Sequence, residues 1–343
     1  MAQAPSLFEL EALKIALSKA LGKPVNHATY TLDMLQGGTV ANVQLVSGTA
    51  ATAGGEVVAY KIVLKTQHKW DRYRDPFSWR REYDLYKSNL PHFFADDFRW
   101  PHCYLAQMNQ AQDQTQLWLE YIDGATGKDL NQSMLEKAAY ALGSFQGKVY
   151  GAYDQVASEL TNTSDQDYAR NFYDHYRSWP VVYDFIRSDQ TELPQHLCQM
   201  LIDFDEVSPQ FFEAIKGLPK VFCHRDYWIA NVFYTKDSIQ AIDWDTAGWG
   251  YLGEDIASFI ADEADNDHMV AYYHGLVSAY LKGFSDQTGI GVEKHYIFER
   301  ILALFGYRLV EWFIYAPSEE RKAVHQRTLE NLYVIMQLNK RCE

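Results

Sequence analysis

The sequence predicts an α+β protein with two lobes, a β-rich N-terminal lobe and a larger helical C-terminal lobe. Strand-like runs of branched and aromatic residues lie within Thr29–Thr66, whereas helical spacing of apolar residues dominates from Gln132 onward. Between the predicted helices lies an irregular, polar stretch, Lys220–Gly253. Because strands followed by helices are typical of α+β proteins, we divide the chain into residues 1–122 and 123–343.

The N-terminal part begins with a predicted helix, since Leu7, Leu10, Leu13 and the run to Leu17 are spaced for one helical face. Turn signals then separate several strand-like runs and one further helix. In chain order, we predict a turn at Gln36–Thr39, strands at Val43–Val46 and Val57–Leu64, a helix at Pro76–Ser88, and strands at Cys103–Met108 and Leu117–Ile122.

The C-terminal part is predicted to be mainly helical. The helices expected from apolar spacing are Met134–Tyr150, Leu197–Ile215, Ile256–Glu263, His268–Phe284, Val292–Tyr315 and Glu319–Arg341. Within the irregular stretch, Val232–Tyr234 and Ile239–Ile242 predict a short hairpin. Asp255 stands directly before one helical pattern and is predicted to be its N-terminal cap.

Composition excludes several classes of function. The formal charge is −14, and an acidic chain repels the phosphodiester backbone, so nucleic acid is not an expected partner. No stretch approaches the roughly 18 consecutive apolar residues that cross a bilayer, and the N-terminal segment is amphipathic rather than signal-like. The four cysteines form no CxxC pair, which favours reduced thiols. We therefore expect a cytoplasmic protein without a membrane partner.

The strongest chemical signal is the segment His224-Arg225-Asp226 followed by Asn231 and, twelve residues later, Asp243. Phosphoryl transfer needs one carboxylate that orients and deprotonates the attacking hydroxyl, and hard oxygen ligands that hold magnesium on the phosphates. Asp226 suits the first role, and Asn231 with Asp243 suits the second. His224 is assigned to bracing the loop, because the carboxylate two positions later already supplies a base.

These residues resemble a known family. His224, Asp226, Asn231, Asp243 and Gly248, with the run to Ala257, are similar to the pattern of aminoglycoside and choline phosphotransferases, the small-molecule branch of the protein-kinase-like superfamily. The resemblance implies a two-lobed protein-kinase-like fold, ATP and Mg²⁺ as cofactors, and transfer of phosphate to the hydroxyl of a small molecule. It covers residues 35–257 in the right order.

The resemblance also implies roles in the N-terminal lobe. It assigns phosphate contacts to the turn with Gly37, Gly38 and Asn42, the phosphate-binding lysine to Lys65, its partner carboxylate to Glu82, and adenine contacts to the backbone between Glu120 and Ile122. Lys61 competes with Lys65, because residues four apart lie on the same side of a strand. We favour Lys65, which stands at the end of the apolar run.

The chain departs from the family pattern at two places, which bear on the acceptor. Leu142–Gln146 replaces the Leu-His pair common in that family, and residues 152–192 resemble an insertion. Aminoglycoside, choline-like, sugar and amino-acid-derived alcohols all fit the motifs. Acidic residues after Asp243 suggest an acceptor with positive charge; they are Glu254, Asp255, Asp262, Glu263, Asp265 and Asp267.

Two other functions compete with a small-molecule kinase. A protein kinase would need Asp-Phe-Gly and a long activation segment, whereas Asp243-Trp244-Asp245 is followed closely by the next helix. A catalytically dead nucleotide-binding protein would lack at least part of the set that this chain retains, namely Lys65, Glu82, Asp226, Asn231 and Asp243.

Overall fold

The computed structural model describes residues 7–35, 40–70, 72, 74–94, 96–236, 238–261 and 267–340. It divides into two compact units. The first comprises residues 1–91 and 100–124, and the second comprises residues 92–99 and 125–343. Apart from residues 92–99, this division lies two residues from the predicted boundary. That segment belongs to the second unit because its strand β5 (Phe98–Arg99) pairs with β11 (Ile239–Ala241).

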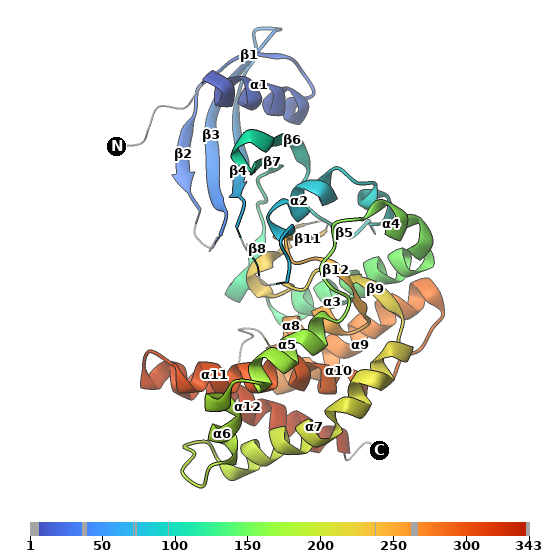
Figure 1. Cartoon of the computed structure of the whole chain (residues 1–343). Coiled ribbons are helices and arrows are strands. Elements are labelled where there is room, and N and C mark those ends of the chain that lie inside the picture. The colour runs from blue at the N-terminus through green and yellow to red at the C-terminus, as the bar shows by residue number, and fades with distance from the viewer. Residues whose placement is uncertain are drawn as a thin grey trace. The chain divides into compact units, whose positions relative to one another are not determined.

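The first unit is an antiparallel sheet in the order β1-β3-β4-β7-β6, with β2 added beside β3 (Figure 1). Its elements in chain order are α1 (Leu7–Leu21), β1 (Val25–Ala28), β2 (Thr31–Met34), β3 (Asn42–Thr52), β4 (Val57–His68), α2 (Ser78–Tyr86), β6 (Cys103–Asn109) and β7 (Gln114–Glu120). The expected strand at 43–46 is thus the start of a much longer one. The predicted turn at 36–39 lies outside the described residues.

Strand alternation decides what each face of this sheet covers. Tyr60, Ile62 and Leu64 of β4 are buried in a core with α1, whose Leu13 and Leu17 are also buried. The residues between them on β4 point to the opposite face, because successive side chains of a strand alternate. Lys65 belongs to this second face, and α2 approaches the strand there through Glu82.

The second unit is mainly helical (Figure 1). Its most extensive helix–helix packing is between α3 (Gln132–Gly151) and α9 (Met269–Thr288). Asn131 caps α3 by accepting a hydrogen bond from the backbone N–H of Met134. Gly289, in the left-handed region at φ 72°, ends α9. The remaining helices are α4 (Tyr153–Glu159), α5 (Tyr168–Arg177), α6 (Pro180–Arg187), α7 (Gln195–Ala214), α8 (Glu254–Ala261), α10 (His295–Ile301), α11 (Tyr307–Ile314) and α12 (Glu319–Lys340).

The irregular stretch of this unit contains short strands, together with one strand, β8, that pairs with them. They are β8 (Ala125–Thr126), β9 (Lys220–Cys223), β10 (Val232–Tyr234), β11 and β12 (Gly248–Tyr251). The predicted hairpin is confirmed, because β10 and β11 are antiparallel with Val232 opposite Ala241. β12 pairs with β9, which places Gly248 opposite Cys223.

The helix predicted at 292–315 is helical from His295 to Ile314, but it is not a uniform α-helix, because the backbone widens to a π-helix at Leu302–Gly306 between α10 and α11. The segment 152–192, for which the sequence predicts no element, folds into α4, α5 and α6. No helix in the described part of the chain is long and apolar enough to cross a membrane.

The crossing of α3 and α9 depends on glycine. A Cβ atom added to Gly143 would lie 2.0 Å from the carbonyl oxygen of Tyr280, and one added to Gly283 would lie 2.1 Å from that of Tyr140. Both contacts are with helix backbone, which cannot turn aside as a side chain can. The two helices therefore approach as closely as they do only because each has a glycine at the crossing.

We expect Gly143→Ala to lower the free energy of unfolding by about 2 kcal/mol or more, because the helices must separate to accept the methyl group. The matched control is Gly151→Ala at the end of the same helix, where no atom lies within 4 Å of the added Cβ. The control is expected to be neutral or slightly stabilising, since alanine favours helix. Urea unfolding of both variants measures the difference; equal stability would contradict this account.

Candidate active site

Asp226 and Asn231 form the centre of the candidate site in the second unit. Asp226 follows β9, and Asn231 ends a short 3-10 turn that leads into β10. The amide nitrogen of Asn231 donates to the Asp226 carboxylate at 2.7 Å and to the Asp226 backbone carbonyl at 2.9 Å. These bonds hold the carboxylate in one orientation. They use only the amide nitrogen of Asn231, and the side-chain oxygen of Asn231 takes no part in them.

His224 connects this loop to the strand that leads to Asp243. Its ring is fully buried, and Nε2 lies 2.8 Å from the carbonyl oxygen of Ile242. Since a carbonyl only accepts, Nε2 donates, and Nδ1 accepts a hydrogen bond of 3.2 Å from the backbone N–H of Asp226. Both ring nitrogens of a neutral imidazole are thereby used, and the ring braces the loop.

The hairpin brings the two predicted metal ligands to the same end. Asn231 directly precedes β10, and Asp243 lies two residues beyond β11. The register is extended by a hydrogen bond of 3.0 Å from the backbone N–H of Ile242 to the carbonyl oxygen of Asn231. Asp243 and Asn231 are therefore near neighbours across the open end of the hairpin.

A buried carboxylate holds the start of the loop that contains Asp226. Asp255 is fully buried and accepts hydrogen bonds from the backbone N–H of His224 at 2.8 Å and of Arg225 at 2.7 Å. The side-chain amide of Gln146 donates to it at 2.8 Å, and the hydroxyl of Tyr280 donates to Gln146 in turn. Burial raises the pKa of Asp255 to about 7, although the two backbone N–H groups lower it.

The predicted capping role of Asp255 is therefore wrong. Helix α8 begins at Glu254, so Asp255 lies within its first turn rather than before it. Its two oxygens face the loop that contains Asp226, where the backbone N–H groups that they bind lie about 30 residues earlier in the chain. Gln146, which donates to Asp255, belongs to the segment Leu142–Gln146, where the sequence departs from the family pattern.

The backbone of this site adopts conformations that side chains other than glycine rarely adopt. Arg225 has φ 67° and Asp243 has φ 66°. Each such residue costs on the order of 1 kcal/mol or more, and such strain persists only where surrounding contacts enforce it. Here the enforcing contacts are those of Asp255 and His224.

Arg225, which the sequence did not single out, is a fully buried cation. Its guanidinium donates to Ser164 Oγ at 2.5 Å, to the carbonyl oxygen of Trp249 at 2.7 Å and to Glu254 at 3.2 Å. Glu254 also accepts from Arg300 at 3.2 Å. One buried carboxylate is thus shared between two buried guanidinium groups.

Lys65 and Glu82 form a buried ion pair in the first unit. Lys65 Nζ lies 2.6 Å from Glu82 Oε2, and both side chains are about nine-tenths buried. Lys61 is exposed and lies over the ring of Tyr121, 5.1 Å from its centroid. Of the two candidates, Lys65 is therefore the one that pairs with the helix carboxylate.

The other residues predicted to contact the nucleotide are only partly described, and those that are described lie in or next to the sheet of the first unit. Gly37 and Gly38 lie outside the described residues. Asn42 begins β3, opposite Thr66. The backbone N–H of Glu120 donates to the carbonyl oxygen of His102 at 2.8 Å, so it is already used within the sheet. Ile122 lies beyond the end of β7, outside regular pairing.

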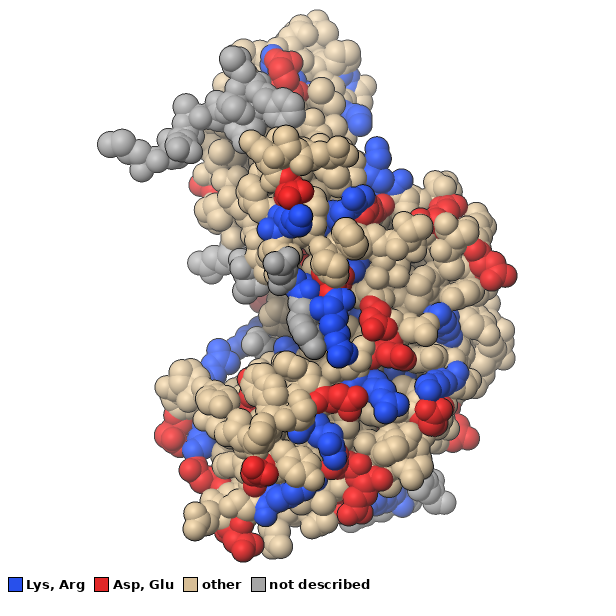
Figure 2. All heavy atoms as spheres, viewed as in Figure 1, with Lys and Arg blue, Asp and Glu red and all other residues tan. Residues whose placement is uncertain are grey.

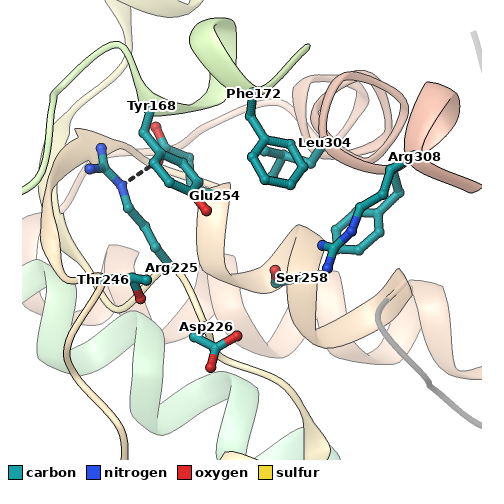
Figure 3. A pocket seen from close by; sticks show the side chains of 10 residues that line it. Tyr168, Phe172, Arg225, Asp226, Thr246, Glu254, Ser258, Leu304 and Arg308 are labelled. Carbon is teal, nitrogen blue, oxygen red and sulfur yellow. Dashed lines mark hydrogen bonds and ion pairs between the residues drawn. The ribbon is translucent and has the colours of Figure 1, made fainter. Parts of the chain in front are cut away.

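A pocket opens beside Asp226 within the second unit (Figure 3). It contains about 520 Å³ of space free of protein atoms, part of it open to solvent. Four of its lining residues have apolar or aromatic side chains; they are Tyr168, Phe172, Leu304 and Phe305. The polar lining residues are Arg225, Asp226, Thr246, Glu254, Ser258 and Arg308.

The acidic residues that suggested a cationic acceptor have other partners where they are described. Glu254 and Asp255 are buried and hydrogen-bonded within the loop, and Asp267 pairs with Arg327 at 2.8 Å on the surface. Asp262, Glu263 and Asp265 lie outside the described residues. On the face of the helical unit that Figure 2 shows, acidic and basic side chains are interspersed.

The side-chain oxygens of Asn231 and Asp243 are of the kind that magnesium binds. In the described part of the chain, no three His, Cys, Asp or Glu side chains gather around one point. Magnesium bound with a nucleotide needs only one or two side-chain oxygens, because phosphates and water complete its coordination. Asn231 and Asp243 provide hard oxygens of this kind.

A family model described as the phosphotransferase enzyme family matches residues 109–289, more than half of the chain. No curated protein matches the sequence at a significant level.

Several solved structures share the fold. A choline kinase from Cryptosporidium parvum Iowa II has a TM-score of 0.56 at 14% identity, with 96% of each chain covered. An aminoglycoside phosphotransferase from Alicyclobacillus acidocaldarius has a TM-score of 0.55 at 13% identity, covering 99% of this chain and 97% of that one. A microcompartment-associated aminopropanol kinase has a TM-score of 0.53 at 11% identity, covering 95% and 96%.

We expect the stability of the protein to depend on pH through Asp255. Its pKa is raised from 3.8 to about 7 in the folded chain, so the folded state binds a proton that the unfolded chain has lost. This contribution is present in full below the unfolded pKa and is lost as pH rises through about 7, by on the order of 1 kcal/mol between pH 6 and 8.

The measurement compares urea unfolding at pH 6 and pH 8 for the native protein and for Asp255→Asn. The variant is expected to be less stable at both pH values, with a smaller difference between them. Asp267→Asn on the surface is the control and should keep the native pH dependence. Identical pH dependence in native protein and Asp255→Asn would show that Asp255 does not titrate in this range.

Proposed function

Since the chain belongs to the phosphotransferase enzyme family and is a small-molecule kinase with an alcohol as acceptor, we propose that it transfers the γ-phosphate of ATP with Asp226 as the catalytic base. The observation that carries the proposal is the orientation of Asp226 by Asn231 beside an open pocket. The proposal accounts for why Asp226, Asn231 and Asp243 are joined through one hairpin.

The proposed step is an in-line displacement. The acceptor hydroxyl oxygen forms a bond to the γ-phosphorus, the bond from that phosphorus to the β–γ bridging oxygen breaks, and ADP leaves. The hydroxyl proton passes to the Asp226 carboxylate. Asn231 keeps that carboxylate turned toward the acceptor, since its amide donates both to the side chain and to the backbone of Asp226.

Asn231 and Asp243 are the proposed magnesium ligands. Magnesium supplies positive charge that neutralises the phosphates and orients them for transfer. The Asn231 side-chain oxygen suits this role because its nitrogen is bound to Asp226. The hydrogen bond between Ile242 and Asn231 keeps both ligands at one end of the hairpin.

Lys65 is the proposed phosphate-binding lysine of the first unit. Its ion pair with Glu82 fixes a flexible side chain near the end of β4, with the charge already desolvated. Adenine would bind to backbone groups after β7, around Ile122, because the Glu120 N–H is already used within the sheet. We place the enzyme in the cytoplasm, in keeping with the free thiols of Cys103, Cys198 and Cys223.

The alternatives are less well supported. A peptide substrate would need a long activation segment, but β12 follows Asp243 closely, pairs with β9 and leads directly into α8. A dead kinase-like protein would not need the two strained residues, Arg225 and Asp243, beside an oriented carboxylate. Turnover by the purified protein decides between this second alternative and the enzyme.

We expect Asp226→Asn to lower turnover by on the order of 10²-fold or more while ATP binding is kept, because proton acceptance and hydroxyl orientation are lost together. The measurement is acceptor-dependent ADP release, with ATP binding followed by thermal shift. The control is Asp189→Asn on an exposed turn, which removes the same charge from the surface. Near-native turnover in a folded Asp226→Asn protein would exclude Asp226 as the base.

We expect Asp243→Ala to lose the magnesium-dependent part of stabilisation by ATP, because Asn231 alone is a neutral and weaker ligand. The melting temperature is measured with ATP in the presence of magnesium and again with a chelator. In the native protein, magnesium should add to the shift; in the variant, the two conditions should agree. An unchanged magnesium increment would show that Asp243 is not a ligand.

A further inference from the structure

Four flat or apolar side chains form one wall of the pocket beside Asp226. Tyr168 and Phe172 come from α5, and their rings stack with centroids 5.6 Å apart and planes at 27°. Leu304 and Phe305 come from the π-helix between α10 and α11. In Figure 3, Tyr168, Phe172 and Leu304 lie along one side of the pocket, and Asp226 lies on the other. Because the face of an aromatic ring carries partial negative charge, this wall favours a ligand that turns C–H groups toward it.

The charged side chains of the described pocket lining balance one another. Two are acids, Asp226 and Glu254, and two are arginines, Arg225 and Arg308. Glu254 is bound by Arg225 and, from outside the lining, by Arg300. Arg308 packs against three aromatic rings, with its guanidinium carbon 4.3, 5.3 and 5.4 Å from their centroids. Since each of these charges is engaged within the protein, a charged acceptor would give up its hydration without gaining a matched partner.

Ser258 of α8 brings an unused hydroxyl to the pocket. The residue is 9 % exposed, and Figure 3 shows its side chain directed into the pocket. Other helical hydroxyls, those of Ser18, Thr288 and Thr328, donate to the carbonyl oxygen four residues earlier. Within the residues that the structure describes, Ser258 Oγ makes no such bond and has no other hydrogen-bond partner. A buried hydroxyl of this kind gains a hydrogen bond when a ligand supplies the partner.

The second small hydroxyl of the lining is already used as a donor. Thr246 Oγ1 donates to the carbonyl oxygen of His224 at 2.9 Å, which leaves it only the capacity to accept from a ligand. Ser258 can donate or accept. Hydroxyl groups on the ligand match both positions, because a hydroxyl is donor and acceptor at once.

An uncharged ring that carries several hydroxyls has the surfaces that this pocket favours. We propose that the acceptor is a neutral pyranose sugar or its glycoside, with C–H groups of one face against Tyr168 and Phe172, one hydroxyl at Asp226 and another bound by Ser258. This proposal rests on the proposed function, because it takes the pocket beside Asp226 to be the acceptor site. It takes the place of the cationic acceptor that the sequence suggested.

The segment that supplies the aromatic wall is fixed against the loop that contains Asp226. Helix α5 belongs to the segment 152–192, and Ser164 of that segment accepts from Arg225 at 2.5 Å. The backbone N–H of Ser164 donates to the carbonyl oxygen of Ala247 at 3.0 Å. A Cβ atom on Gly248 would lie 2.4 Å from Ser164 Oγ, so glycine is required there for the segment to approach. The wall is therefore held in place before a ligand binds.

The probes are the methyl pyranosides of glucose, galactose and mannose, each used as the neutral sugar, the 2-amino sugar and the uronate. Dissociation constants for the nucleotide-free protein are measured by ligand-observed NMR. Turnover is measured separately as ADP release with magnesium and ATP. We expect at least one neutral sugar to bind about tenfold more tightly than its amine and its uronate, because a charge buried without a partner is unfavourable.

The variant Ser258→Ala isolates the unused hydroxyl. It should lower affinity for the best-bound neutral sugar about three- to tenfold, the range of one hydrogen bond. Deoxy analogues of that sugar, each lacking one hydroxyl, identify the group that Ser258 binds, because one of them should lose no further affinity in the variant. The matched control is Ser133→Ala, which removes an exposed hydroxyl from α3 outside the pocket and should change nothing.

The variant Phe172→Leu tests the wall, because it keeps an apolar side chain and removes the flat face. It should lower affinity for the same sugar about threefold or more. Melting temperatures establish that each variant is folded.

The outcomes separate this inference from the proposed function. No binding of any neutral sugar, equal or tighter binding of the amines or uronates, or a sugar affinity that either pocket variant retains would each overturn the inference. Binding that prefers a neutral sugar and needs Ser258 and Phe172 supports it whether or not phosphate is transferred. If that sugar binds without causing ADP release, the proposed function fails and the sugar site stands. If only a charged alcohol is bound and phosphorylated, the inference fails and the proposed function stands.

Discussion

The buried carboxylate of Asp255 is the constraint on which the rest of the helical unit's site depends. It accepts hydrogen bonds from two successive backbone N–H groups, those of His224 and Arg225. Arg225 is held with φ 67°, a conformation that an arginine adopts only under constraint. A hydrogen bond contributes about 0.5–1.5 kcal/mol to stability, so the two together are enough to offset strain on the order of 1 kcal/mol. Asp226 follows directly, so its position is set by the same contacts.

Ile242 carries this order from the loop to the hairpin. Its carbonyl oxygen accepts from His224, and its N–H donates to the carbonyl oxygen of Asn231. The backbone of Ile242 thus joins His224, which stands two residues before the proposed base, to Asn231, which orients that carboxylate, and to the strand that leads to Asp243. Such an arrangement lets the proposed base and the proposed magnesium ligands keep fixed relative positions without any direct contact among all three.

Charge is distributed differently within the helical unit from what the net value suggests. The chain is strongly acidic, yet the described lining of the pocket beside Asp226 holds two arginines, Arg225 and Arg308, beside two acids, Asp226 and Glu254. Because Coulomb interactions strengthen where water is excluded, the few groups at the pocket matter more for a ligand than the many on the surface.

The sequence alone was sufficient for the two-part α+β organisation and for proposing the set Asp226, Asn231 and Asp243, because these residues lie in one continuous stretch with fixed spacing. It was not sufficient to choose between Lys61 and Lys65. Both lie on the same face of β4, and only the approach of α2 buries one of them beside Glu82.

Contacts between distant segments decided the partners of Asp255 and the lining of the pocket. Asp255 resembles a helix cap when only its neighbours are considered, but its partners are Gln146 and a loop about 30 residues earlier. The pocket wall joins α5 to a π-helix more than a hundred residues later, and a change in helical pitch leaves no periodic signal in the sequence. Local patterns thus determined which residues we propose for the chemistry, whereas packing between distant segments determined their hydrogen-bond partners and the lining of the pocket beside Asp226.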